Sequence, residues 1–263
     1  MDLGLMDRVA VIGGGSKGLG RACADSLAKE GANLVICSRN SDELDEVAKE
    51  INTVTGVDVL PVAADLSRLE DIQVLIKRAV DHFGRLDILV NNSGGPPAGR
   101  ANDTTDEVWY RSLDMALLFF VRMSRESIPH MKRGKWGRIV NVLASSVYQP
   151  IDNLVTSGVT RMGAVAFAKS LSDEVGRNNI LVNNVAPGYL LTDRMMHIFE
   201  TRSGETGANV EDLLEAHSET IPVGRLGRPE ELGDLVTFLA SDKNTYTTGA
   251  TILVDGGVVR SVM

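Results

Sequence analysis

The 263-residue sequence contains only two cysteines, four histidines and 5% aromatic residues. Cys23 lies in a predicted first helix and Cys37 in a predicted second strand, so two reduced core thiols are expected rather than a disulfide or a metal pair. No metal site is predicted, because no ligand spacing links the histidines. These are His82, His130, His197 and His217.

The sequence also lacks long apolar runs and an excess of positive charge. No run is long enough to span a bilayer, and no signal peptide is expected before the first apolar run at Val9, so we predict a cytoplasmic protein. The net charge of -8 and the pI near 5.1 argue against nucleic acid and anionic membranes as partners. With 43% hydrophobic residues and no Pro- or Ser-rich linker, residues 1–263 are expected to form one domain.

Short β-branched runs alternate with longer helical segments. This alternation, with runs that are continuously apolar, predicts an α/β fold of the doubly wound Rossmann type, with three layers and a parallel sheet of seven strands. The predicted strands are 9–12, 34–37, 57–62, 88–91, 138–143, 181–185 and 251–254. The predicted helices are 19–29, 42–53, 69–83, 106–131, 156–176 and 229–240.

A glycine-rich loop at residues 13–20 follows the first predicted strand and opens the first helix. Glycines at Gly14, Gly18 and Gly20 leave no Cβ between the backbone and a ligand, so a pyrophosphate could lie on the free N–H groups at the helix N-terminus. The alternative is a turn that only lets the helix pack on the strand. Its place in the first βα turn favours a dinucleotide site.

The second predicted strand ends in Ser38-Arg39-Asn40, where a site specific for NAD usually has an acid. Lys17 and Arg39 supply cations for a 2′-phosphate, so NADP(H) is expected and NAD(H) is disfavoured. Both could instead be ordinary solvated charges. Asp65, after the third strand, is interpreted as a helix N-cap, as an acceptor for the adenine amine, or as both.

With the motif Asn91-Asn92-Ser93-Gly94, the sequence resembles the short-chain dehydrogenase/reductase family nearly from end to end. The glycine loop, residues 182–188 and residues 248–257 carry the same resemblance, the last being similar to the tail of β-ketoacyl carrier-protein reductases. The resemblance implies that Asn91 holds the centre of the sheet and that Thr192 binds the nicotinamide carboxamide. The expected cofactor-binding residues are Gly14, Ser16, Lys17, Gly18, Leu19, Gly20, Ser38, Arg39, Asp65, Leu66, Asn92, Ser93, Gly94, Arg161, Pro187, Gly188 and Thr192.

The family's four catalytic positions are all altered. Alignment places Ser157 at the position of the family's Tyr and Arg161 at that of its Lys. Ala144 stands at the Ser position and Ala116 at the Asn position. A serine hydroxyl is too weak an acid to replace a phenol, and Arg161 can bind ribose hydroxyls but cannot relay protons.

Other groups could supply the missing proton. Ser145 and Ser146 follow the fifth predicted strand, and Tyr148 is the only nearby phenol in the loop expected to border substrate. The alternative for Tyr148 is an aromatic that covers the cofactor or the core, because a general acid must reach the carbonyl oxygen. Tyr189 is a weaker candidate. Residues 189–217 are interpreted as a substrate lid, with a plain surface helix pair as the alternative.

Three functions are compatible with this pattern. The first is an NADP(H)-dependent oxidoreductase acting on a small carbonyl or alcohol substrate, similar to 3-oxoacyl reductases. The second is a non-catalytic NADP(H)-binding sensor or scaffold, and the third is a non-redox lyase resembling the halohydrin dehalogenases. Apolar stretches at residues 115–121 and 162–167 also favour a homodimer or homotetramer, as is usual in the family.

Overall fold

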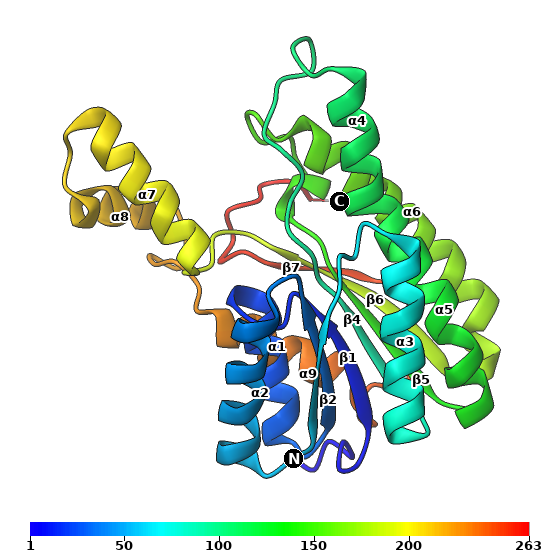
Figure 1. Cartoon of the computed structure of the whole chain (residues 1–263). Helices are drawn as coiled ribbons and strands as arrows, with labels where there is room; N and C mark the ends of the chain where they lie inside the picture. Colours follow the sequence, from blue (N-terminus) through cyan, green and yellow to red (C-terminus); the bar gives the residue numbers. More distant parts are fainter. Residues whose placement is uncertain (263) are drawn as a thin grey trace.

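A seven-stranded parallel sheet forms the centre of the computed structural model, which describes residues 1–262 (Figure 1). The strand order is β3-β2-β1-β4-β5-β6-β7. The predicted fold class is therefore confirmed. The strands are β1 Val9–Gly13, β2 Asn33–Ser38, β3 Val59–Ala63, β4 Ile88–Asn91, β5 Gly137–Val142, β6 Ile180–Pro187 and β7 Thr251–Val254.

Helices cover both faces of the sheet (Figure 1). Alternate side chains of β1 enter different cores: Ala10 and Ile12 join the cluster beneath α1, α2 and α9, whereas Val9 and Val11 join the one beneath α3, α5 and α6. The helices are α1 Gly18–Lys29, α2 Ser41–Thr55, α3 Leu69–Phe83, α4 Asp106–Leu113, α5 Phe119–Gly134, α6 Val155–Val175, α7 Asp193–Thr206, α8 Val210–Glu219 and α9 Pro229–Leu239.

The predicted helix 106–131 is not continuous. A π-helical segment, Asp114–Leu118, separates α4 from α5 and contains the buried Ala116. The wider π turn alters the local backbone pairing, and the Met115 carbonyl oxygen accepts a hydrogen bond from Ser93 Oγ at 3.1 Å. Apolar periodicity cannot distinguish such a segment from an ordinary helical turn, so the predicted helix runs straight through it.

Buried amides cross the sheet from β4 to β7. Asn91 Nδ2 donates to Asn141 Oδ1 at 2.8 Å, Asn141 Nδ2 donates to Asn184 Oδ1 at 2.8 Å, and Asn184 Nδ2 donates to Thr251 Oγ1 at 3.0 Å. These residues are directly paired in the strand registers. Asn91 thus lies at one end of an amide ladder that links four strands.

Helices α7 and α8 project from the body of the fold (Figure 1, yellow). They account for most of the segment 189–217, so the helix pair considered as an alternative is present. The ring of His217 on α8 lies 4.2 Å from that of Tyr189 and 5.5 Å from that of Phe199 on α7, both edge to face. This aromatic cluster connects the projecting pair to the chain that leaves β6.

Both cysteines are free and buried, and burial raises the pKa of each thiol to about 12. None of the helices within residues 1–262 has the length and apolar character needed to cross a membrane. Over the same residues, no group of three or more His, Cys, Asp or Glu side chains is placed to hold a metal ion.

Candidate active site

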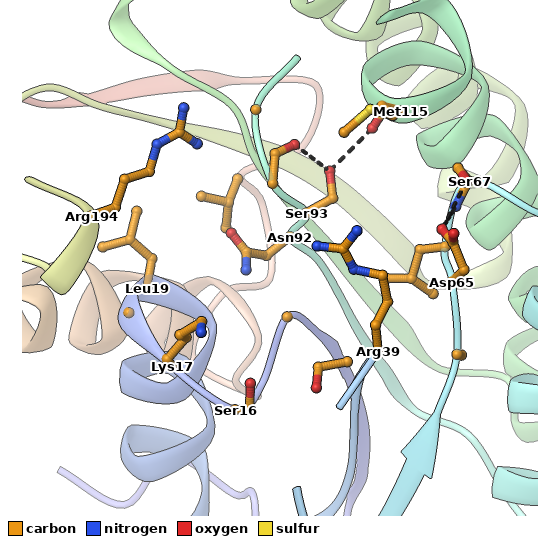
Figure 2. Close-up of a pocket in the computed structure, with 18 of the residues that line it drawn as sticks. Ser16, Lys17, Leu19, Arg39, Asp65, Ser67, Asn92, Ser93, Met115 and Arg194 are labelled. Carbon is orange, nitrogen blue, oxygen red and sulfur yellow. Dashed lines mark hydrogen bonds between the residues drawn. The ribbon is translucent and has the colours of Figure 1, made fainter. Parts of the chain in front are cut away.

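A cleft of about 1110 Å³ opens at the carboxyl ends of β1, β2, β4 and β5. Strand order reverses between β1 and β4, the point at which open α/β sheets bind ligands. Figure 2 shows side chains from the glycine loop, the β2 end and the α7 start around this cleft. Most of the expected cofactor residues line it: Gly14, Ser16, Lys17, Gly18, Leu19, Ser38, Arg39, Asp65, Leu66, Asn92, Ser93, Gly94, Arg161 and Thr192.

The glycine loop has the form of a phosphate cradle. Gly14 has a φ of +61°, and a Cβ built on Gly20 would lie 2.1 Å from the Gly14 carbonyl oxygen. Asn92 Nδ2 donates to the Gly13 carbonyl oxygen at 2.9 Å, which ties the loop to the end of β4. The side chain of Lys17, the N-cap residue of α1, makes no capping hydrogen bond. The first N–H groups of α1 are therefore open to a ligand in the cleft, as a pyrophosphate requires.

Arg39 and Asp65 lie near each other on one side of the cleft (Figure 2). Asp65 Oδ1 accepts hydrogen bonds from the Ser67 N–H at 3.0 Å and from Ser67 Oγ at 2.7 Å. The Ser67 N–H bond, with help from the Ser67 hydroxyl and the Arg39 charge, lowers the pKa of Asp65. The N-cap interpretation of Asp65 is wrong: the N-cap of α3 is Arg68, and Asp65 instead closes a turn before it.

Lys17 has a partner that motif reading missed. Glu43, in the first turn of α2, accepts a hydrogen bond from Ser16 Oγ at 2.9 Å, and its other oxygen lies 3.5 Å from Lys17 Nζ. Part of the positive charge expected of Lys17 is therefore offset. Arg39 forms no ion pair within residues 1–262, and its charge interacts only with the nearby Asp65 carboxylate, beyond ion-pair distance.

Three expected cofactor residues lie outside the cleft lining: Gly20, Pro187 and Gly188. Gly20 packs on Gly14, and a Cβ on Gly188 would lie 2.6 Å from Asp255 Cβ, so both glycines permit close packing. Thr192 lines the cleft and also caps α7, with its Oγ1 accepting from the Met195 N–H at 3.3 Å. That capping role was not predicted from the sequence.

Arg161 is a buried cation at the end of β5. Its side chain is on α6, only 7% of the residue is exposed, and Nη1 donates to the carbonyl oxygens of Val142, at 3.3 Å, and Leu143. Arg161 Nε has no partner in the part of the chain that the structure describes. Burial, and secondarily the charge of Arg194, lowers the pKa of Arg161 to about 10, so the guanidinium remains protonated at neutral pH.

The structure does not bring the proposed proton donors to the cleft wall. Ser157, Ser145 and Ser146 are buried, and none of them lines the cleft; Ser146 Oγ has no partner among the described residues. Tyr148 points elsewhere: its hydroxyl donates to the Thr251 carbonyl oxygen at 2.6 Å, and burial raises its pKa. Tyr148 is therefore not placed to act as the general acid, because its hydroxyl proton is hydrogen-bonded to the backbone and the residue does not line the cleft. Tyr189 packs on His217 instead.

Several cleft residues were missed by the sequence analysis. Arg194, in the first turn of α7, is the most consequential, and its position two residues after Thr192 was the available signal. Met115 and Leu143 directly precede Ala116 and Ala144, two of the altered catalytic positions. The remaining missed residues are Ala64, Ser67, Arg68, Gly95, Arg111, Asp114, Val142 and Asp193.

Comparison with known proteins identifies the family. Residues 14–259 match the family model described as enoyl-(acyl carrier protein) reductase. The 3-oxoacyl-[acyl-carrier-protein] reductase FabG of Aquifex aeolicus is 32% identical over 98% of this chain and 100% of its own. The chain belongs to the short-chain dehydrogenase/reductase family. This is a family of oxidoreductases, and the predicted family membership is confirmed.

Two further relatives illustrate the range of this family. Dehydrogenase/reductase SDR family member 4 of Oryctolagus cuniculus is 31% identical, with 96% of this chain and 94% of the relative covered. The crystal structure of L-sorbose reductase from Gluconobacter frateurii, complexed with NADPH and L-sorbose, matches with a TM-score of 0.97 and 33% identity, over 100% of both chains.

Proposed function

We propose that this protein is an NADP(H)-dependent oxidoreductase that interconverts a small-molecule carbonyl and alcohol. The observation that carries the proposal is the continuity of the cleft, which runs from Arg39 and the uncapped α1 N-terminus to the buried guanidinium of Arg161. Its volume is slightly above the usual ~300–1000 Å³ of small-ligand pockets, as a dinucleotide and a substrate together would require. Membership in a reductase family supports the assignment.

The residues present fit the cofactor. Gly14, Gly18 and the first N–H groups of α1 would hold the pyrophosphate, Arg39 the 2′-phosphate, and Thr192 the carboxamide. Arg161 has free donors for the ribose hydroxyls of the nicotinamide half. When bound, the nicotinamide supplies the hydride for the carbonyl carbon.

Among the described residues no phenol lines the cleft, so the proton that the carbonyl oxygen must receive comes from another source. We assign it to a water that enters the cleft and is oriented by the donors of Arg161, which lines the cleft, whereas the buried Ser157, Ser145 and Ser146 do not. The permanently charged guanidinium would stabilise negative charge as it develops on the oxygen. Arg161 thus acts electrostatically, in place of a proton relay.

The assay is the oxidation of NADPH, followed at 340 nm, with ketones, quinones and β-ketoacyl thioesters. Consumption that depends on one of these carbonyls is expected. Saturable NADPH binding without turnover on any of them would favour the second candidate, a non-catalytic NADP(H) sensor or scaffold; the absence of a phenol from the cleft is the observation that favours it. The lyase resembling halohydrin dehalogenases ranks third, because the glycine cradle is intact.

Three secondary assignments accompany this proposal. The helix pair α7–α8 serves as a substrate lid over residues 189–217. The protein assembles into a homodimer or homotetramer through exposed apolar side chains of the π segment and α6, namely Leu118, Val159 and Met162. Light scattering would detect this assembly as a mass well above 28.3 kDa. The protein works in the cytoplasm.

A further inference from the structure

Two arginines at the Arg161 end of the cleft lack acidic partners. Arg161 is buried with Nε unbonded, and the side chain of Arg194 makes no hydrogen bond or ion pair within residues 1–262. The two guanidiniums are close enough that the Arg194 charge contributes to lowering the pKa of Arg161. Two like charges that disfavour each other in the free protein would both be stabilised by an anion in the cleft.

The position of Arg194 strengthens this argument. It lies in the first turn of α7, where the helix dipole disfavours a cation. Its guanidinium lies against Gly95, near the start of the loop after β4, where a built Cβ would be 3.2 Å from Arg194 Nη1. Figure 2 shows Arg194 on the opposite side of the cleft from Asp65, away from the end assigned to the adenosine. The unpaired guanidinium of Arg194 is therefore available to bind a ligand in the cleft.

The acids that line this end of the cleft form no ion pair with either arginine among the described residues. Asp193 lines the cleft beside Arg194, but no ion pair joins them in the described chain. Asp114 also lines the cleft, and it is engaged by Arg122 at 2.9 Å. The Arg161 end of the cleft therefore carries net positive charge in a protein whose net charge is -8.

We propose that Arg194, with the buried Arg161 behind it, forms an anion subsite that binds the carboxylate of the substrate, so that the carbonyl substrates are oxo acids. This proposal rests on the proposed reductase function and names its substrate class. A guanidinium matches the two oxygens of a carboxylate with parallel donors, whereas a neutral ketone offers it one weak acceptor. The pyrophosphate of the cofactor is the other possible source of anionic oxygens, and the experiment separates the two.

The test compares 2-oxo and 3-oxo carboxylic acids with their methyl esters as substrates of the NADPH-loaded protein. For the wild type, kcat/KM is expected to favour the acid by at least about tenfold, mostly through KM. In Arg194→Met this preference should fall to within about twofold of unity. The control is Arg202→Met, which removes an exposed arginine from the same helix outside the cleft lining and should keep the acid preference.

Two binding measurements complete the test. Calorimetry of the NADPH-loaded wild type with a carboxylic acid that lacks the oxo group should detect binding, and Arg194→Met should abolish it. This measurement needs no turnover, so it tests the subsite even if no carbonyl is reduced and the reductase proposal fails. The NADPH affinity of Arg194→Met should remain within about twofold of the wild type. The carboxylate subsite would be overturned if the wild type showed equal kcat/KM for acid and ester. It would also be overturned if Arg194→Met lost affinity for NADPH and inorganic pyrophosphate instead of for the acid.

Discussion

Glu43 and Lys17 face each other at the edge of the cofactor cleft, with Glu43 Oε1 3.5 Å from Lys17 Nζ. Lys17 is largely exposed, so the pair itself contributes little to stability. Its importance is electrostatic: a carboxylate stands beside one of the two cations assigned to the phosphates of NADP(H). We therefore expect Arg39 to carry most of the NADP(H) preference.

We expect Glu43→Gln to bind NADPH more tightly, by about two- to fivefold, since the change removes a negative charge near the phosphates while an amide oxygen can still accept from Ser16. Fluorescence titration measures the effect. Glu46→Gln, an exposed site on the same helix, is the control and should match the wild type. An unchanged or weaker affinity in Glu43→Gln would show that the carboxylate does not oppose the cofactor.

Arg161→Ala should weaken NADPH binding by roughly 1–3 kcal/mol, the usual effect of losing hydrogen bonds to a charged group. Arg161→Lys keeps the charge and should retain most of the affinity. Because the residue is buried, circular dichroism of each variant must first match the wild type. Wild-type affinity in a folded Arg161→Ala protein would remove Arg161 from the cofactor site.

Tyr148→Phe should leave kcat nearly unchanged, because the hydroxyl donates to the Thr251 carbonyl instead of facing the cleft. It should lower the free energy of unfolding by about 1 kcal/mol, the typical net value of one hydrogen bond. Turnover at 340 nm and urea denaturation provide the two readouts. A fall in kcat of about a hundredfold would instead identify the phenol as the general acid.

The α7–α8 pair should loosen as the pH falls. Burial, and secondarily the charge of Arg202, lowers the pKa of His217 below its ordinary value of about 6.5. The packed state therefore binds fewer protons than the unpacked state, so its stability is complete above pH ~6.5 and declines as the pH drops toward the lowered pKa.

Amide hydrogen exchange across residues 189–220, corrected for intrinsic rates, should therefore be faster relative to the core at about pH 5 than at about pH 7.5. His217→Phe keeps an aromatic ring against Tyr189 and should abolish the difference. His197→Gln alters an exposed histidine on α7 and should preserve it. Equal pH dependence in wild type and His217→Phe would refute the assignment to His217.

The fold could be predicted because strand periodicity, the glycine loop and the order of the elements are local signals. The start of β3 was placed two residues early, at Val57 instead of Val59, where apolar residues lead into the strand. The site was harder to predict. The family resemblance identified Arg161 and Ser157, but it could not show that Tyr148 bonds the backbone, that Glu43 reaches Lys17, or that Arg194 lies against Gly95. Those relationships depend on tertiary packing between distant segments.

The amide ladder from Asn91 to Thr251 also fixes how the strands can slide against one another. Successive side chains of a strand point to opposite faces, so a shift of one residue in β5 would turn Asn141 away and break its bonds to Asn91 and Asn184 together. An uninterrupted row of valine and isoleucine would tolerate such slippage far better. The ladder thus fixes the register of β4 against β5. It thereby fixes the relative positions of Ser93 and of the Val142 and Leu143 carbonyl groups that bind Arg161.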